Sequence, residues 1–193
     1  MTYTIVGLGN PEEKYEDTRH NVGRVVLDAI REARGFSDWS ADKYSKSLVV
    51  KNMIGNKEAV LVEPDNYMNN SGESVKYFVK SDADVENLIV VHDDMYLPLG
   101  EIKISYGKGT GGHNGIDSII KHIGTKNFTR VRIGVAQKNI FGKIKKQRDQ
   151  SRFVLGKFTA REAEAVKEIS TKAVQAIDMI IKEGREKAAN KFN

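Results

Sequence analysis

The sequence predicts a single α/β domain, and three observations lead to that class. The chain has 193 residues, of which 39% are hydrophobic, and this length falls within the ~100–200 residues of a typical domain. Short apolar runs, each followed by turn-forming residues, predict buried strands. Elsewhere, apolar residues recur at three- and four-residue intervals, which is the spacing of one helix face. No repeat or linker divides the chain, so we expect one domain over residues 1–193.

The first predicted strand and helix lie near the amino terminus. Tyr3–Leu8 is an apolar, β-branched run that ends at Gly9-Asn10-Pro11, which predicts a buried strand entering a loop. An apolar helix face follows, with Asn21 placed to cap the helix and Gly35 placed to end it. The residues of that face are Val22, Val25, Val26, Ala29, Ile30 and Ala33.

A hairpin and a short helix are predicted next. The apolar runs Leu48–Met53 and Ala59–Val62 flank Gly55-Asn56, which is the composition of a hairpin turn. Asn70 and Glu73 resemble a capping box, which predicts a helix beginning there. We expect that helix to continue through Val75, Phe78 and Val79.

The clearest site signal in the pattern follows the run Leu88–Val91. These apolar residues predict a buried strand, and His92-Asp93-Asp94 comes directly after it. In α/β folds, ligands bind at the carboxyl ends of strands. We therefore expect these polar residues to belong to a functional site.

Two strands and two helices complete the predicted domain. Ile102-Lys103-Ile104 and Val131-Arg132-Ile133 alternate apolar and basic side chains, so each strand should have one buried and one cationic face. A helix through Ile116–Ile123 is expected between these strands. Thr159 and Glu162 form a capping box for a long helix that should end at Gly184.

Positive charge is concentrated in one segment. The chain has 31 basic and 26 acidic residues, a net charge of +5, and Ser118–Arg148 contains nine cations and no Asp or Glu. Such a local excess is typical of a protein that binds a polyanion, although a solvated surface rich in lysine is the alternative. The polar, lysine-rich residues at about 136–150 predict a mobile basic surface loop.

Composition excludes several classes of protein. The chain has no cysteine, so a disulfide scaffold and a cysteine-based metal site are both excluded. No apolar segment approaches the ~20 residues of a membrane span, and the first thirty residues do not resemble a signal peptide. We expect a cytoplasmic protein.

Two generic ligand-binding motifs fit the sequence poorly. Gly107–Gly112 matches GxGxxG, but no acidic residue follows at the distance needed to bind a ribose. A metal site is the other alternative, but the spacing of its candidate ligands matches no zinc pattern. Those ligands would be His92, Asp93, Asp94 and His113. We therefore expect no cofactor and no metal, and we expect His122 to be structural.

A hydrolase with this sequence would use water as its nucleophile. The chain has neither a cysteine nor a GxSxG elbow to form an acyl-enzyme. Attack by water needs a general base, a group that fixes the tautomer of the base, and donors for the oxyanion. His20 lies in a polar loop between a strand and a helix, where we expect an exposed imidazole. Together with Asp93 and several asparagines, it can meet these needs.

Four separated motifs span nearly the whole chain. The first is Gly7–Pro11 with Tyr15 and Thr18–Gly23, and the second is Tyr67–Gly72. The third is His92–Asp94 with Leu97–Gly100, and the fourth is Gly111–Gly115. In residues, order and spacing, these motifs resemble the bacterial-type peptidyl-tRNA hydrolase family.

The resemblance implies a fold, a reaction and a mechanism. The family's fold is a single α/β domain with a twisted mixed β-sheet flanked by helices. Its members hydrolyse the ester between a peptide, or an N-blocked amino acid, and the 3′-terminal ribose of peptidyl-tRNA, which recycles the tRNA. By this resemblance, His20 would be the general base that activates water, and Asp93 would orient and stabilise it. Asn10 would help to distinguish a peptidyl group from a free aminoacyl group.

The resemblance also implies which residues bind the substrate. Tyr15 and Tyr67 would line the cleft for the 3′ end of the tRNA, where an aromatic ring can stack on a base. Asn69 and Asn114 would position substrate and water, although each is also placed to cap a helix. The expected partner is tRNA, through its 3′ end and acceptor stem, and the chain is expected to be a monomer without a membrane partner.

Phosphate contacts are expected from the basic strands. Lys103 and Arg132 are the main candidates, with Arg130 as an alternative to Arg132. The sequence departs from the family's common pattern at three positions, so we expect this clamp to be arranged differently. These are Tyr96 for an acidic residue, Ser105 for a basic one and Lys108 for a glycine.

The alternative function is a non-catalytic RNA-binding module of the same fold. Such a module has no need for a general base, its carboxylate partner and the substrate-positioning asparagines together. This chain has all of them, namely His20, Asp93, Asn10 and Asn114. The sequence therefore favours an enzyme.

Overall fold

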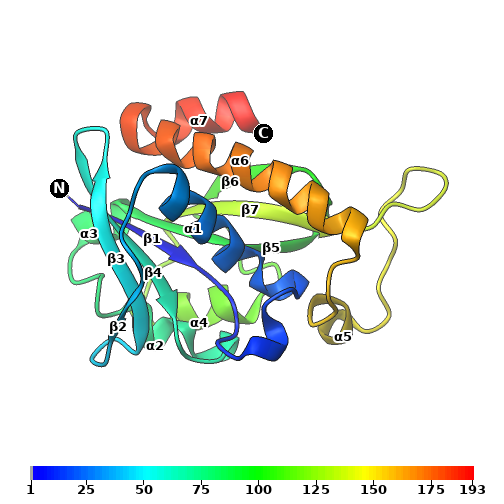
Figure 1. Ribbon diagram of the computed structural model, residues 1–193, viewed down its shortest axis with the longest axis horizontal. Coiled ribbons are helices and arrows are strands. Elements are labelled where there is room, and N and C mark those ends of the chain that lie inside the picture. Colours follow the sequence, from blue (N-terminus) through cyan, green and yellow to red (C-terminus); the bar gives the residue numbers. More distant parts are fainter. Residues whose placement is uncertain (1) are drawn as a thin grey trace.

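Seven strands form one β-sheet in the computed structural model, which describes residues 2–193 (Figure 1). Their order in the sheet is β2-β3-β4-β1-β5-β7-β6. The strands are β1 (Thr2–Gly7), β2 (Ser40–Asp42), β3 (Ser47–Ile54), β4 (Lys57–Pro64), β5 (Leu88–Pro98), β6 (Ile102–Tyr106) and β7 (Thr129–Ala136).

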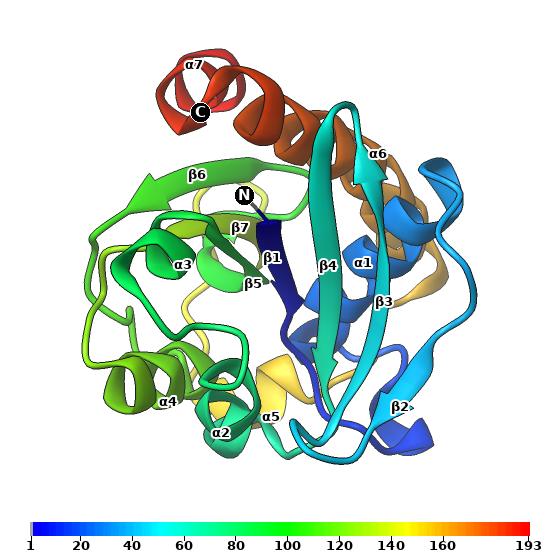
Figure 2. The ribbon, with the colours of Figure 1, turned by 90° about the vertical axis from the view of Figure 1, so that its left-hand side faces the viewer.

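Parallel pairs form the centre of the sheet and antiparallel pairs form its edges. Strand β1 is parallel to both β4 and β5, and β5 is parallel to β7. The β2–β3, β3–β4 and β6–β7 pairs are antiparallel. Figure 2 shows the strand direction turning from β3 and β4 to β6, so the sheet is mixed and twisted, as expected.

Helices cover both faces of the sheet (Figures 1 and 2). One face packs against α1 (Val22–Ala33), α6 (Ala160–Glu183) and α7 (Arg185–Phe192), and the other against α2 (Ser71–Val75), α3 (Asp82–Glu86) and α4 (Asn114–Ile123). Helix α5 (Gln150–Val154) precedes α6. None of the helices formed by residues 2–193 combines the length and apolar character that crossing a membrane requires.

The continuous apolar run of β5 reflects burial on both faces. Ile89 and Val91 pack in the cluster under α1 and α6, whereas Leu88 and Val90 pack in the cluster under α2 and α4. A central parallel strand needs apolar residues on both sides, and this requirement explains the four consecutive apolar residues.

Several predicted elements are confirmed. Strands β3 and β4 form the expected hairpin, and Gly55 adopts φ +64° at its turn. The capping box of α6 is present, because Glu162 N–H donates to the Thr159 hydroxyl at 3.3 Å and Thr159 N–H donates to the Glu162 carboxylate at 2.8 Å.

Two predicted caps are wrong. Asn21 and Asn70 occupy the positions before α1 and α2, but neither side chain bonds to the helix backbone. Asn21 instead pairs with the backbone of Asn10, and Asn70 accepts from Asn69 Nδ2 at 3.3 Å. Helix α2 also ends at Val75, earlier than predicted.

Other boundaries differ because pairing and packing act beyond the local pattern. Strand β5 continues through His92–Asp94, since these residues pair with β7 as far as Gly134. The short elements β2, α3, α5 and α7 were not predicted, because segments this short carry little periodic signal.

Candidate active site

Close backbone packing brings the predicted general base to the end of the central strands. A Cβ atom at Gly23 would lie 2.5 Å from both Leu8 N and Val91 O, so only glycine permits the start of α1 to approach β1 and β5 this closely. His20 lies just before this contact, in the 3₁₀ turn η2 (Arg19–Asn21). The approach places its imidazole beside Asp93 of β5.

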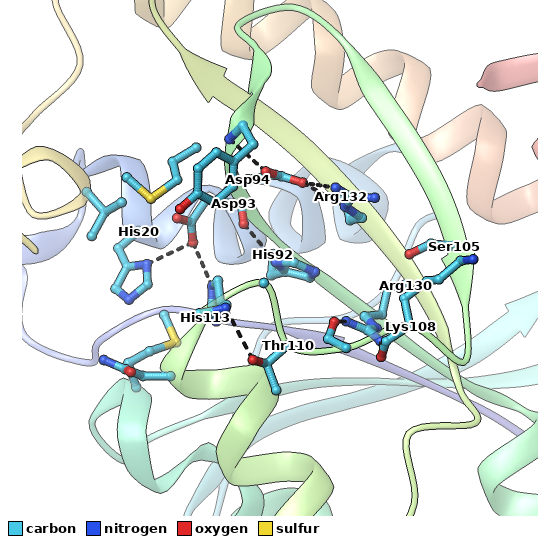
Figure 3. A pocket seen from close by; sticks show the side chains of 18 of the residues that line it. His20, His92, Asp93, Asp94, Ser105, Lys108, Thr110, His113, Arg130 and Arg132 are labelled. Atoms are coloured by element: carbon cyan, nitrogen blue, oxygen red, sulfur yellow. Dashed lines mark hydrogen bonds and ion pairs between the residues drawn. The ribbon is translucent and has the colours of Figure 1, made fainter. Parts of the chain in front are cut away.

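Asp93 joins two histidines through one carboxylate oxygen (Figure 3). His20 Nδ1 lies 2.8 Å from Asp93 Oδ1, and His113 Nε2 lies 2.9 Å from the same oxygen. His20 is 8% exposed and Asp93 is 3% exposed. The prediction of an exposed imidazole at residue 20 is therefore wrong, because η2 packs the ring into the molecule.

The proton on His113 is fixed by the helix that the residue caps. His113 Nδ1 accepts from Gly115 N–H at 3.1 Å and from Ile116 N–H at 3.4 Å. An accepting Nδ1 in a neutral ring requires the proton on Nε2, which therefore donates to Asp93. From the sequence, His113 was a candidate only for a metal ligand, and Asn114 was the candidate cap. Histidine is not a preferred capping residue, so the cap at His113 was not predicted.

The tautomer of His20 follows from its contact with the carboxylate. Nδ1 faces Asp93, so Nδ1 carries the proton and donates it. Within residues 2–193, no hydrogen bond involves His20 Nε2, and His20 lines a cavity. The lone pair of Nε2 is therefore available to a water molecule.

The two histidines keep Asp93 ionised despite its burial. Burial by itself raises the pKa of the Asp93 carboxyl, but His20 and His113 more than offset that effect and hold the pKa well below its ordinary value. An ionised Asp93 at neutral pH stabilises positive charge on an adjacent imidazole.

His92 contacts both Asp93 and His113 of this cluster. Its Nδ1 donates to Asp93 O at 2.7 Å, and its ring meets that of His113 edge to face, with 4.7 Å between centroids. Burial, together with His113, holds the pKa of His92 well below its ordinary value, so the ring is neutral.

The donor set of this cluster does not fit a metal ion. The ligand atoms of His20, Asp93 and His113 lie within 4.8 Å of one another, which is close enough to share an ion. However, both nitrogens of His113 are already committed, one as an acceptor and one as a donor. A metal at Nε2 would require an imidazolate. Asp94, the other carboxylate of the motif, is instead paired with Arg132.

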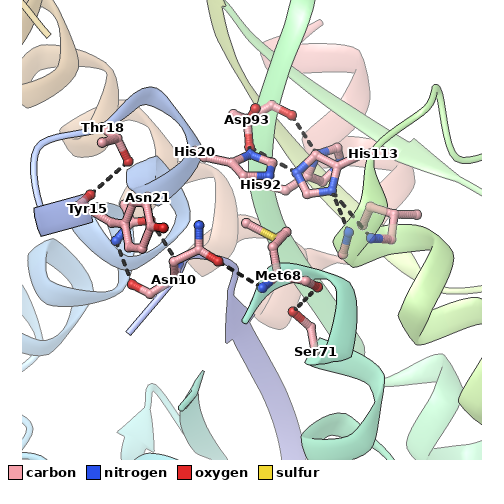
Figure 4. Close-up of polar contacts among 12 residues, drawn as sticks. Asn10, Tyr15, Thr18, His20, Asn21, Met68, Ser71, His92, Asp93 and His113 are labelled. Atoms are coloured by element: carbon pink, nitrogen blue, oxygen red, sulfur yellow. Dashed lines mark hydrogen bonds and ion pairs between the residues drawn. The ribbon is translucent and has the colours of Figure 1, made fainter. Parts of the chain in front are cut away.

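The side-chain amide of Asn10 is oriented by the backbone around it (Figure 4). Asn10 Oδ1 accepts from Met68 N–H at 2.9 Å. Asn21 fixes the backbone, because its Oδ1 accepts from Asn10 N–H and its Nδ2 donates to Asn10 O, both at 2.9 Å. These contacts leave the Nδ2 donors of Asn10 for the cavity that it lines.

A cavity of about 970 Å³ is lined at once by the histidine cluster and by basic side chains that we call the cationic region, namely Lys103, Lys108 and Arg132. Its lining includes the predicted residues Asn10, His20, Asn69, Asp93, Asn114, Lys103 and Arg132. Asn69, Asn114 and Lys103 are exposed to it, whereas Arg132 Nε and Nη2 donate to Asp94 Oδ2 at 2.6 and 2.5 Å. The fold thus assembles residues from all four sequence motifs around one space.

Arg130 also lines the cavity, but its side chain is buried and bonded to the backbone, which does not favour its prediction as an alternative phosphate contact. It is 2% exposed, and Nη1 donates to Gly109 O at 2.8 Å while Nη2 donates to Lys108 O. Arg130 thereby holds the glycine-rich segment against the sheet. Lys108 itself is exposed to the cavity, and Ser105, in place of a basic residue, also lines it.

The two predicted aromatic residues lie outside this cavity. The Tyr67 hydroxyl donates to Glu12 Oε1, and Glu12 forms a 2.7 Å ion pair with Lys14, whose ammonium lies 4.9 Å from the Tyr15 ring centroid. These contacts join the two rings through Glu12 and Lys14, and neither ring lines the cavity, so the prediction that they line it is wrong.

Comparisons with known proteins identify the family and match the fold. The family model for peptidyl-tRNA hydrolase matches residues 4–193. The peptidyl-tRNA hydrolase of Lachnospira eligens is 38% identical to this chain over 192 residues, which cover 99% of each chain. The peptidyl-tRNA hydrolase of Aquifex aeolicus is 41% identical over 178 residues, which cover 90% of this chain and 86% of the Aquifex protein. The crystal structure of peptidyl-tRNA hydrolase from Acinetobacter baumannii superposes with a TM-score of 0.87 at 30% identity, covering 100% of this chain and 94% of its own. With similarity over its whole length and all four motifs around one cavity, this chain belongs to the peptidyl-tRNA hydrolase family.

Proposed function

We propose that this protein hydrolyses the ester between a peptide, or an N-blocked amino acid, and the 3′-terminal ribose of tRNA. The observation that carries the proposal is the His20–Asp93 pair at 2.8 Å, in which His20 Nε2 bonds to none of the described residues and His20 lines the cavity. A base held in one tautomer by a buried carboxylate is the arrangement that water activation needs. Membership of the family supports the substrate class.

The reaction proceeds by attack of water on the ester carbonyl. His20 Nε2 takes one proton from water while the oxygen forms a bond to the carbonyl carbon, and Asp93 stabilises the resulting imidazolium. The tetrahedral intermediate then breaks its bond to the ribose 3′ oxygen, which receives the proton from His20. The products are a peptide carboxylic acid and tRNA with a free 3′ hydroxyl.

The asparagines give selectivity and position the reactants. The free Nδ2 donors of Asn10 bond a carbonyl oxygen of the peptide, which a free aminoacyl group lacks. Asn69 and Asn114, which both line the cavity, position substrate and water. A neutral amide does this without repelling the phosphates of the substrate.

The cationic region binds the tRNA backbone. Lys103 and Arg132, which line the cavity, contact phosphates of the acceptor stem. Tyr15 and Tyr67, which lie outside the cavity, contact the 3′ end. The protein acts in the cytoplasm as a monomer, because its substrate is there and the site is complete within one chain.

The proposal is tested by release of a labelled N-blocked amino acid from tRNA, with EDTA present throughout. Unblocked aminoacyl-tRNA is the control substrate, and circular dichroism verifies that each variant is folded. The parent should cleave only the blocked substrate. His20→Ala should lose ~100- to 10,000-fold in turnover, which is the usual contribution of a positioned general base.

Separate measurement of tRNA binding distinguishes the alternative function. His20→Ala should bind tRNA as the parent does. A folded parent that binds tRNA without cleaving it is a non-catalytic RNA-binding module. Equal cleavage by the parent and His20→Ala would remove His20 from the mechanism.

A further inference from the structure

Between β7 and α5 the chain leaves the body of the molecule as a projecting arm, residues 137–149, which we name the finger (Figure 1). Lys138 and Ile144 form an antiparallel bridge across it. At its turn, Asn139 Oδ1 accepts from Phe141 N–H at 2.9 Å and from Lys143 N–H at 3.0 Å. The finger is therefore a hydrogen-bonded hairpin that presents a defined tip.

The tip of the finger is apolar and its stem is cationic. Ile140 is 94% exposed and Phe141 is 79% exposed, so neither packs against the body of the protein. The stem carries Lys138, Lys143, Lys145, Lys146 and Arg148, and the first acidic residue after residue 118 is Asp149. Among residues 2–193, the only ion pair of these cations joins Lys138 to Glu101. The others are available to a polyanion.

The base of the finger adjoins the cavity that contains His20. At one end, Gln137 Nε2 donates to Glu162 Oε1 at 2.9 Å, and Glu162 accepts from Arg19, the neighbour of His20, at 2.9 and 3.0 Å. At the other end, Gln150 and Ser151 of α5 line the cavity. An RNA whose 3′ end occupies the cavity can therefore extend along the finger.

We propose that the finger is an additional RNA-binding element, in which Phe141 stacks on an unpaired base and the stem cations contact the adjacent phosphates. This inference rests on the proposed function, because it assumes that RNA enters the cavity. An aromatic ring flanked by cations is the combination that binds single-stranded nucleotides without reading their sequence. Two apolar residues at a hairpin tip form no extended amphipathic face, which favours RNA over a lipid surface.

The first test measures binding of deacylated tRNA by the full chain over a range of salt concentrations. Phe141→Ala should weaken affinity by about 5-fold or more at every salt concentration, because loss of one stacked base has an effect of this size. The slope of log affinity against log salt should not change. The matched control is Tyr44→Ala, which removes a ring that is 84% exposed in the β2–β3 turn and should bind as the parent does.

Charge is tested separately from stacking. Replacing Lys143, Lys145 and Lys146 with Gln should reduce the salt slope by about two to three, since each phosphate contact contributes roughly 0.7–0.9. The control replaces three exposed cations elsewhere, Lys43, Lys167 and Lys172, and should leave a larger slope. Equal slopes for the two triple variants would overturn the proposed phosphate contacts.

Stacking itself is tested by fluorescence. The parent contains a single tryptophan, Trp39, so Phe141→Trp adds one indole at the tip of the finger. Addition of tRNA should quench the added emission relative to the parent. An unchanged emission at saturating tRNA would show that the tip does not meet a base.

Hydrolysis and vesicle binding separate the remaining outcomes. If the parent cleaves peptidyl-tRNA but Phe141→Ala and the finger lysine variant bind tRNA as the parent does, the inference fails and the proposed function stands. If the parent neither binds nor cleaves, both fail. A further outcome is that the parent co-sediments with anionic phospholipid vesicles and Phe141→Ala does not, while both bind tRNA equally. That result would identify the finger as a lipid-binding element instead.

Discussion

Asp93 on β5 and Glu63 on β4 are both buried carboxylates of the central sheet, yet their surroundings differ. Asp93 is 3% exposed and accepts from His20 and His113 at 2.8 and 2.9 Å. Glu63, on β4, is 4% exposed, and among residues 2–193 its Oε1 has no hydrogen-bond partner and its ion-pair partner is Arg24, with Nη1 at 3.7 Å. Burial raises the pKa of Glu63 to about 8, although Arg24 opposes the shift.

The contrast shows that nearby donors, rather than burial, decide whether an internal carboxylate is ionised. The pKa of Asp93 is lowered, so its contribution to stability is present above its unfolded value near 4 and is lost as pH falls. The pKa of Glu63 is raised, so the folded protein loses stability as pH rises from about 4.5 to about 8. Only Asp93 offers a negative charge that can support a general base.

The largest effect is expected from removing that charge with Asp93→Asn. The amide oxygen can still accept a hydrogen bond, but it no longer balances an imidazolium at His20. Turnover should fall by ~100- to 10,000-fold while tRNA affinity stays near that of the parent. Single-turnover cleavage and tRNA titration measure the two quantities. A large loss of affinity with unchanged turnover would contradict the role assigned to Asp93.

A smaller effect is expected from removing one of the two histidine donors. His113→Asn keeps a side chain that can cap α4 but loses the contact with Asp93, so turnover should fall by ~10-fold, the size of one hydrogen bond to a charged group. His113→Ala loses the cap as well and should also reduce stability by ~1 kcal/mol.

Cleavage rates and denaturant unfolding of the two His113 variants separate the roles of the residue. Equal turnover by His113→Asn and the parent would mean that His20 alone keeps Asp93 ionised. Equal stability of the two variants would mean that the side-chain cap contributes nothing.

The sequence predicts those parts of this site that local patterns encode. A four-residue apolar run located the strand that carries Asp93, and the motif around Thr18–Gly23 identified His20. The role of His113 was not predictable, because its contact with Asp93 spans 20 residues and depends on where α4 begins. Arg130 and Arg132 share one alternating pattern on β7, and only the folded glycine-rich segment decides that Arg130 is buried and Arg132 is not.

The smallest effect on catalysis is expected at Glu63, where the change should alter stability but leave turnover unchanged. Glu63→Gln removes a group that resists ionisation, so the variant should gain roughly 4 kcal/mol relative to the parent between pH 5 and pH 8. Glu168→Gln, at an exposed position on α6, should leave the pH dependence of the parent unchanged. Urea unfolding at both pH values measures the difference, and peptidyl-tRNA cleavage should be equal in all three proteins. If Glu63→Gln and the parent change in parallel with pH, then Arg24 keeps Glu63 ionised from 3.7 Å, and hydrogen-bond contact is not what distinguishes Asp93.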